Sequence, residues 1–169
     1  TGYTGNIVSW IYSTDAGMSW SWAGNSPSQP YSNINVAMEW AVIVGSPFGL
    51  CANDTSWAAH IDVVPQTIAG NLPANFDICT GANAGALNLT GYLGTILGWE
   101  FSQDNGFTWV PVSNTSDELL YANLTDTTLY QVLVQNGVCP AVYTTPVTLT
   151  LVPGSDAGTI TGELLVCNF

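Results

Sequence analysis

The sequence predicts an all-β protein made of tandem β-sandwich domains, and three observations lead to this prediction. The composition combines 17 Gly with seven Trp, seven Tyr and five Phe in a chain rich in Thr, Asn and Ser. Such a mixture of turn formers and strand formers is typical of β proteins. The chain also matches itself at an offset of about 88 residues. Strand-like runs in the second copy recur about every 8–12 residues.

The repeat is visible along most of the chain. Residues 1–10 (TGYTGNIVSW) return at 90–99 (TGYLGTILGW), and Val64-Pro65 returns as Val152-Pro153. A unit of about 88 residues is too long for a solenoid repeat and suits one complete small domain. The four cysteines occupy two equivalent positions of the repeat, Cys51 with Cys139 and Cys79 with Cys167.

The matches divide the chain into three parts, each with an expected structure. Residues 1–65 form a repeat that lacks its opening strands, 66–153 a complete repeat, and 154–169 the opening strand of a following repeat. We therefore interpret the chain as a window onto a longer tandem array. The alternative is a subunit whose tail completes the open sandwich of the next copy by strand addition.

Six strands are expected in the complete repeat. Their spacing is typical of an immunoglobulin-type sandwich, and the run TLTL within the last of them alternates as a half-buried strand does. The expected strands are Ala86–Thr90, Thr95–Phe101, Thr108–Val112, Leu119–Asn123, Leu129–Gln135 and Val147–Val152.

The cysteines predict a disulfide in the second repeat. Cys79 opens that repeat, Cys139 follows its penultimate long strand, and Trp99 lies between them, as in Cys…Trp…Cys sandwiches. Cys51 and Cys167 would then need partners outside this window or in a neighbouring copy. A disulfide implies an oxidising, extracellular setting. The alternative is four reduced, buried thiols.

The charge balance excludes several classes of function. The chain has 12 Asp and Glu, one His and no Lys or Arg, which gives a net charge of −12. Without cations it cannot neutralise phosphates, so nucleic acids and anionic membranes are not expected partners. No apolar run is long enough to span a membrane. With His60 as the single histidine and no acid pair, we expect no enzymatic activity, no cofactor and no metal site.

Two segments fit the pattern S-x-D-x-G-x-[ST]-W and resemble the Asp-box hairpin of sialidases and of many secreted β proteins. The aspartate can accept amide protons of the turn, the glycine permits an unusual φ, and the tryptophan packs over the turn. We interpret both as rigid structural turns, with a carbohydrate or metal contact as the alternative. The residues are Ser13, Asp15, Gly17 and Trp20 in the first, and Ser102, Asp104, Gly106 and Trp109 in the second.

Three tryptophans have no tryptophan counterpart in the second repeat. Trp22, Trp40 and Trp57 align with Pro111, Tyr130 and Thr145. Unmatched aromatic residues are candidates for an exposed contact with sugars or with a neighbouring subunit. The alternative is packing peculiar to the first repeat. Trp10 and Trp99, which match each other, are expected in the core.

Several positions are candidates for glycosylation. Asn53, Asn114 and Asn123 each begin an N-x-[ST] triplet. Thr127, in Asp126-Thr127-Thr128, resembles the D-[ST]-x acceptor used for O-glycosylation in Bacteroidetes. A surface glycan would favour solubility where charged side chains are few.

The chain resembles the Ig-like tandem repeats of very large Bacteroidetes surface proteins, the adhesins and gliding-associated proteins exported by the type IX system. The shared features are a T-G-Y-x-G-x-[IV]-x-x-W start, the Asp-box-like hairpin, and the string LYQVLVQNGVCPAVYTTPVTLT at 129–150. Residues 79–153 carry the resemblance best. The first repeat departs from it, with Glu39-Trp40 in place of Leu129-Tyr130. The absence of Lys and Arg is a further departure.

The resemblance implies an extracellular, cell-surface role without catalysis, as a repeat of an adhesin stalk or surface filament. The expected partners are neighbouring repeats, copies of the same chain, and surface glycans. Two alternatives stay open. One is a carbohydrate-binding module that uses exposed tryptophans, and the other is a subunit that polymerises by strand exchange.

Overall fold

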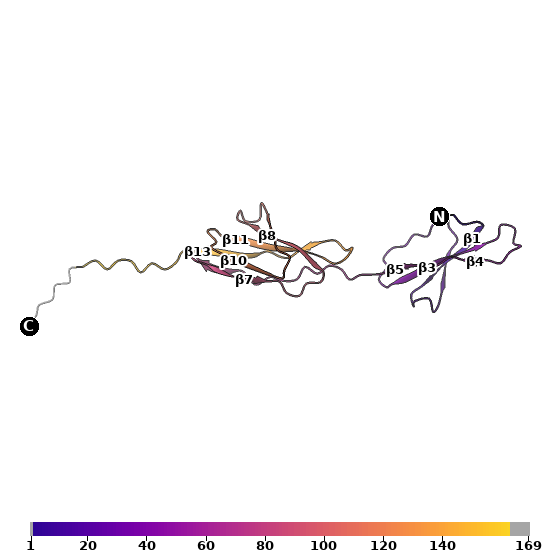
Figure 1. The fold of residues 1–169 in the computed structure, drawn as a ribbon, viewed down its shortest axis with the longest axis horizontal. Helices are drawn as coiled ribbons and strands as arrows, with labels where there is room; N and C mark the ends of the chain where they lie inside the picture. Colours follow the sequence, from indigo (N-terminus) through magenta and orange to yellow (C-terminus); the bar gives the residue numbers. More distant parts are fainter. Residues whose placement is uncertain (1, 163–169) are drawn as a thin grey trace, which may run out of the picture. The chain divides into compact units, whose positions relative to one another are not determined.

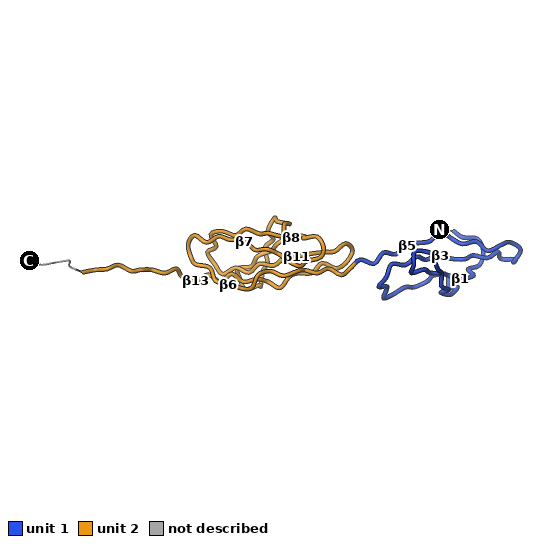
Figure 2. Tube along the Cα trace, turned by 90° about the horizontal axis from the view of Figure 1, so that it is seen from below, with its two compact units in different colours: residues 1–64 blue, residues 65–169 orange. Residues whose placement is uncertain are grey.

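The computed structural model describes residues 2–162, and its secondary structure is entirely β. This confirms the all-β prediction. The chain divides into two compact units, unit 1 at 1–64 and unit 2 at 65–169 (Figure 2). The division falls one residue before the predicted boundary. No helix that could cross a membrane occurs in the described part of the chain.

Unit 2 contains two sheets (Figure 1). All of its strand pairs are antiparallel except β13 with β6, which run parallel. The larger sheet has the order β6(Phe76–Cys79), β13(Val147–Val152), β11(Thr128–Gln135), β8(Thr95–Ser102) and β9(Val110–Val112), with β12(Val142–Tyr143) paired to β11. The smaller sheet pairs β10(Glu118–Ala122) with β7(Ala84–Asn88).

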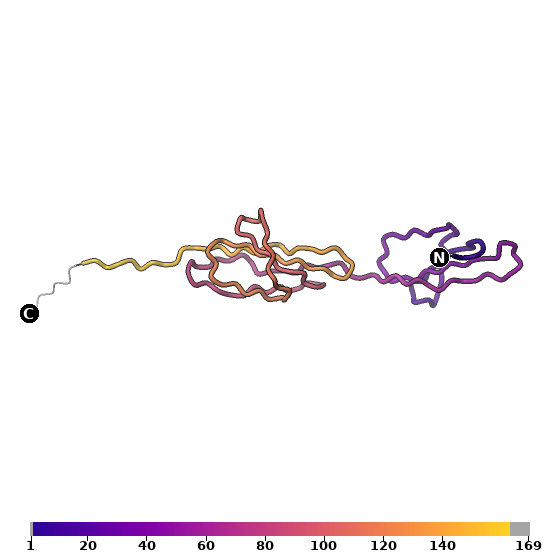
Figure 3. Tube along the Cα trace, turned by 45° about the horizontal axis from the view of Figure 1, so that its top comes forward, coloured from indigo at the N-terminus to yellow at the C-terminus, as the bar shows by residue number. Residues whose placement is uncertain are grey.

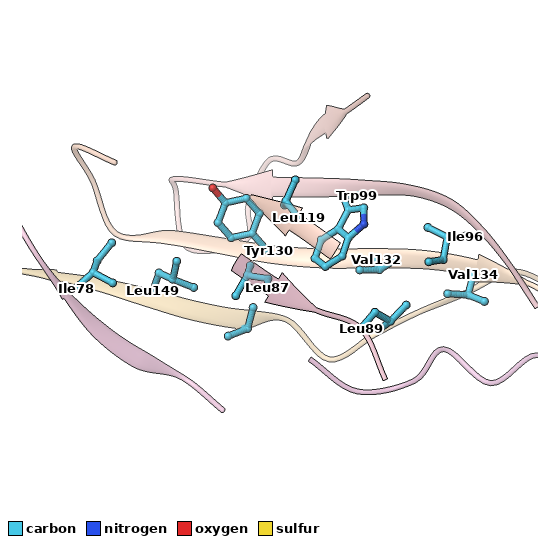
Figure 4. Close-up of a cluster of buried hydrophobic side chains, with 11 residues drawn as sticks. Ile78, Leu87, Leu89, Ile96, Trp99, Leu119, Tyr130, Val132, Val134 and Leu149 are labelled. Atoms are coloured by element: carbon cyan, nitrogen blue, oxygen red, sulfur yellow. The ribbon is translucent and has the colours of Figure 1, made fainter. Parts of the chain in front are cut away.

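The core of unit 2 lies between these two sheets. Leu87 and Leu119 come from the smaller sheet, and they meet side chains of β8, β11 and β13 (Figure 4). Trp99 is completely buried there, as the sequence predicts, and its Nε1 donates a hydrogen bond to the carbonyl of Ser116 at 2.8 Å. A buried indole N–H needs such an acceptor, because leaving it unpaired costs about 1–3 kcal/mol.

The predicted strands of unit 2 are present, with shifted ends. The last of them, at 147–152, has the predicted bounds. The strand expected at 119–123 ends instead at Ala122, because Asn123 has a φ of 52°. Asparagine is among the few residues that adopt this left-handed conformation readily, and the conformation ends an extended strand.

Unit 1 contains a single sheet. Its strands match the larger sheet of unit 2, and Asn33 repeats the left-handed conformation of Asn123 with a φ of 54°. The order is β2(Ser21–Gly24), β1(Asn6–Ser13), β3(Met38–Gly45) and β4(Asp54–Thr55), with β5(Ala59–Ile61) also paired to β3.

Among residues 2–64, no second sheet covers either face of this sheet. Residues 28–32, which correspond to β10, form no strand, and the counterparts of β6 and β7 would precede residue 1 in the repeat. Tyr31 is 65% exposed as a result, whereas its counterpart Tyr121 packs against Phe76 with ring centroids 6.4 Å apart. Ala41 is the one hydrophobic residue that the structure shows fully buried in unit 1.

The predicted disulfide between Cys79 and Cys139 is wrong. Both thiols are free, and they lie at opposite ends of the larger sheet. Cys79 pairs with Val152 beyond the start of β11, whereas Cys139 follows the end of β11. The eight residues of β11 span about 25 Å, far more than the roughly 7 Å that a disulfide allows between Cα atoms.

The alternative of four buried thiols is not met either, because Cys51 and Cys79 are exposed and Cys139 is partly exposed. Cys167 lies outside the described residues. The same holds for much of the opening strand predicted at 154–169. Its described part, 154–162, follows β13 (yellow in Figure 3), is exposed and forms no strand.

Candidate functional site: the outer sheet face of unit 1

The two Asp-box-like turns have nearly the same geometry. Asp15 Oδ1 accepts hydrogen bonds from Ser13 Oγ at 2.7 Å and from the amide of Ser19 at 2.8 Å. The buried Ser13 Oγ accepts the amide of Gly17 at 2.9 Å, and Trp20 Nε1 donates to the Gly17 carbonyl at 3.1 Å. The turn therefore uses its polar groups on itself.

The second turn repeats these contacts. Asp104 Oδ1 accepts from Ser102 Oγ at 2.7 Å and from the amide of Thr108 at 2.8 Å, and Ser102 Oγ accepts the amide of Gly106 at 2.9 Å. Trp109 packs over Gly106, since a Cβ added at that glycine would lie 3.7 Å from its ring.

These bonds lower the pKa of both aspartates. The hydroxyl of Ser19, then its amide, then Ser13 lower the pKa of Asp15 to about 2, and Thr108 and Ser102 do the same for Asp104. A carboxylate saturated in this way has little capacity left for a ligand. No group of three potential metal ligands occurs among residues 2–162. The geometry therefore favours structural turns.

Unit 1 carries a row of apolar side chains across one face of its sheet. This face corresponds to the side of the larger sheet of unit 2 that points away from the core, so we call it the outer face and the row the outer row. Trp22 of β2 pairs with Ile11 of β1, and Ile11 pairs with Ala41 of β3. Trp57 lies beyond Ala41, next to Ser56, whose amide donates to the carbonyl of Val42 at 2.9 Å. The outer row consists of Trp22, Ile11, Ala41 and Trp57.

The two ends of the outer row are open to solvent. Trp22 is 69% exposed and Trp57 is 98% exposed. Between them, Ile11, Ala41 and Trp57 line a shallow pocket together with Trp20 of the Asp-box turn. Trp20 and Trp57 therefore border a small apolar floor, and Trp22 lies beside Ile11 on the same face.

Trp40 does not belong to this surface. It follows Glu39 and precedes Ala41 on β3, so its side chain lies on the opposite face, where it pairs with Tyr12. Their ring centroids are 5.3 Å apart, and the Trp40 Nε1 is buried without an acceptor. The structure therefore brings together Trp22 and Trp57 of the three unmatched tryptophans, and adds Trp20.

Unit 2 has a polar face in the corresponding place. The counterparts of Ile11 and Ala41 are Glu100 and Gln131, and Gln131 Nε2 donates to Glu100 Oε2 at 2.8 Å. The hydroxyl of Tyr143 donates to Glu100 Oε1 at 3.2 Å. Sequence reasoning missed Ile11 and Ala41. The signal was available in the repeat, where an apolar residue replaces a polar one at both positions.

Polar groups flank the outer row on the same face. Glu39 lies two residues from Ala41 on β3 and pairs with His60 of β5. His60 Nδ1 lies 3.7 Å from Glu39 Oε1, and its Nε2 lies 2.9 Å from Asp62 Oδ1. His60 lies on β5 and is about half exposed.

The candidate glycosylation positions lie in loops. Asn53, Asn123 and Thr127 are exposed, and Asn114 is partly exposed. The Asn114 amide is engaged, because its Nδ2 donates to the Glu118 carbonyl at 2.8 Å and its Oδ1 accepts from the Ser116 amide at 2.7 Å. Glycosylation stays a prediction at all four.

Comparisons with known proteins give one family match. A family model described as a domain of unknown function, DUF8696, matches residues 68–153. No curated protein matches. Among solved structures, the crystal structure of chicken CNTN1 FN1-FN3 domains aligns with a TM-score of 0.30 and 14% identity over 94% of this chain. The chain spans 65% of that structure's length, and a TM-score this low supports no argument about fold or function.

Proposed function

The chain belongs to the DUF8696 family of domains of unknown function, and we propose that it is a non-enzymatic structural repeat of an extracellular adhesin stalk or surface filament. On this proposal its units are tandem immunoglobulin-like sandwiches. The matching backbone of the two units supports this, since Asn33 and Asn123, and both Asp-box-like turns, have the same conformation at equivalent positions.

One observation carries the mechanical part of the proposal. The first and last strands of unit 2, β6 and β13, pair in parallel through Phe76–Cys79 and Leu149–Val152. Tension between the two ends of unit 2 would therefore pull these strands along their length in opposite directions. The hydrogen bonds between them must then break together rather than one after another, and this resists force better than peeling does.

Contacts just outside the two strands reinforce the pair. The Thr80 amide donates to the Val152 carbonyl at 2.9 Å, and Thr80 Oγ1 accepts the Gly154 amide at 3.1 Å. At the other end, Asn75 Oδ1 accepts the Thr148 amide at 2.8 Å. The ladder is thus closed by side-chain bonds at each end.

Single-molecule pulling of the full chain tests this role. We expect unit 2 to unfold in one step that releases about 300 Å, the extended length of about 88 residues. Thr80→Pro removes the amide donor and should lower the unfolding force, whereas the matched control Thr80→Ser keeps both the amide and the hydroxyl that accepts the Gly154 amide. Equal forces in the two variants would contradict a mechanical role for the β6–β13 pair. Labelling intact source cells with an antibody against unit 2 tests the surface location.

A second candidate function rests on the outer row of unit 1. Its tryptophans can stack against sugar rings, while Glu39 and Asp62 can accept hydroxyl protons beside it. A chain without Lys or Arg has no partner for acidic sugars, so the ligand would be a neutral polysaccharide. The row is one residue wide and about 14 Å long. The area of so narrow a row is far below the roughly 800 Å² per partner that a stable protein interface buries.

Pull-down of the full chain on insoluble neutral polysaccharides tests the second function. Trp22→Ala and Trp57→Ala should each reduce the bound fraction. Phe107→Ala is the matched control, because Phe107 is an 87% exposed aromatic residue in unit 2. Equal binding by all three variants would contradict the assignment to the outer row.

A further inference from the structure

Cys79 and Cys139, the two cysteines of unit 2 that the structure describes, lie next to equivalent repeat positions at opposite ends of the unit. Cys139 Sγ lies 3.3 Å from the carbonyl oxygen of Pro65, where unit 2 begins. The side chain of Asn136 also donates to that carbonyl, at 2.8 Å. Cys79 pairs in the parallel ladder with Val152, the last residue of β13.

Val64-Pro65 and Val152-Pro153 are the same position of the repeat. The sequence after each continues in the same way, and Gly70 and Gly158 both have positive φ, 83° and 65°. A unit that begins at Pro153 as unit 2 begins at Pro65 would place its own counterpart of Cys139 beside Pro153. Two cysteines would then flank consecutive residues, Val152 and Pro153.

Both cysteines would adjoin the same Val-Pro junction, and backbone rotation at that junction sets the distance between them. Paired strands lie about 4.8 Å apart and consecutive Cα atoms about 3.8 Å apart. Disulfides join residues whose Cα atoms are about 4.4–6.8 Å apart. By contrast, no rearrangement of side chains brings Cys79 to Cys139 within one unit, because the length of β11 separates them.

We infer that Cys79 forms a disulfide with the counterpart of Cys139 in the unit that follows, so that consecutive units are stapled across each Val-Pro junction. The inference rests on the tandem-repeat function proposed above. Cys139 would bond the counterpart of Cys79 that belongs to the preceding unit, and Cys51 would take the same role as Cys139. The staple limits bending at the junction without adding any bond inside a sandwich.

The chemistry is thiol oxidation with a disulfide oxidant. Two thiols lose two protons and two electrons as the S–S bond forms, and the disulfide of the oxidant accepts them and becomes a dithiol. The exposure of Cys79 and Cys51 leaves their sulfur atoms accessible to such an oxidant.

The test is a thiol map of the natural full-length protein. Free thiols are alkylated at lysis, and the protein is digested with pepsin, since trypsin finds no Lys or Arg in this chain. Mass analysis without reduction should find the Cys79 peptide linked to a peptide with the Cys139-type sequence of another unit. Alkylated Cys79 and Cys139, or a Cys79–Cys139 link within one unit, would overturn the inference.

A second experiment distinguishes a partner thiol in the same long chain from one in a separate copy. The 169-residue chain alone is oxidised in a glutathione redox buffer and compared with Cys79→Ser. Monomers before and after oxidation, together with a linked Cys79 peptide in the thiol map, assign the partner thiol to the same long chain. Covalent polymers linked from Cys79 of one copy to Cys51 of another keep the pairing and assign it to separate copies. Failure of the mechanical function would appear in the pulling experiment and would leave the thiol map unaffected.

Discussion

Trp10 and Trp99 each donate an indole hydrogen bond to the carbonyl of an equivalent serine, although the two rings differ in burial. Trp10 Nε1 reaches the carbonyl of Ser26 at 2.9 Å, and Trp99 Nε1 reaches that of Ser116 at 2.8 Å. Trp99 is completely buried, whereas Trp10 is partly exposed. The local contact repeats because it depends on nearby residues, and the burial differs because a second sheet covers only Trp99.

This pair predicts unequal effects of truncation. Trp99→Ala should lower the free energy of unfolding of unit 2 by about 3–5 kcal/mol, because it leaves a large cavity between two sheets. Trp10→Ala should cost unit 1 less, since part of the ring already contacts water. Urea denaturation of the full chain, followed by fluorescence of the remaining tryptophans, measures both. Equal losses would mean that unit 1 also covers its inner face in solution.

Two glycines of unit 2 differ in how much room the structure leaves for a side chain. Gly94 has a φ of 135°, and a Cβ there would lie 2.5 Å from the carbonyl oxygen of Gln135. Gly98 has no atom within 4 Å of such a Cβ. We expect Gly94→Ala to destabilise unit 2 by about 1–3 kcal/mol or more, and Gly98→Ala to change its stability by less than about 1 kcal/mol. Thermal melts of the two variants measure this difference, and equal melting temperatures would contradict it.

The Asp-box-like turns predict a loss of stability in acid. The folded pKa of Asp104 is about 2, below its ordinary value of 3.8. The contribution of this group to stability is therefore fully present above pH 3.8 and is lost as the pH falls toward 2. Thr108→Val removes the hydroxyl that lowers the pKa most, so carboxyl NMR should show the Asp104 titration move toward 3.8. An unchanged titration would contradict the assigned cause.

Substitution of Trp57 should affect polysaccharide binding without affecting the stability of unit 1. Its side chain is 98% exposed, so Trp57→Ala should change the free energy of unfolding of unit 1 by less than about 0.5 kcal/mol. Any loss of polysaccharide binding by this variant would then come from the surface itself. Calorimetry of the variant beside the wild type provides the comparison. A large drop in melting temperature would show that Trp57 packs against something in solution.

The sequence by itself determined the all-β class, the repeat, six of the strands of unit 2 and the Asp-box-like turns, but it missed β6 and β12. Each of these depends on neighbours within a few residues, or on comparison of one copy with the other. The alternation in 147–152 and the serine, aspartate and glycine of each turn are such local signals. The burial of Trp99 was also predicted, whereas Trp10, which was expected in the core with it, is partly exposed.

Only the tertiary structure decided which cysteines can meet and which tryptophans share a face. The order Cys79, Trp99, Cys139 suggested a bond, but the length and direction of β11 place the two thiols at opposite ends. Trp40 was grouped with Trp22 and Trp57, but strand register places it on the other side of the sheet. Distances along a sheet and sides of a sheet are set by pairing between distant strands, and a linear sequence does not contain them.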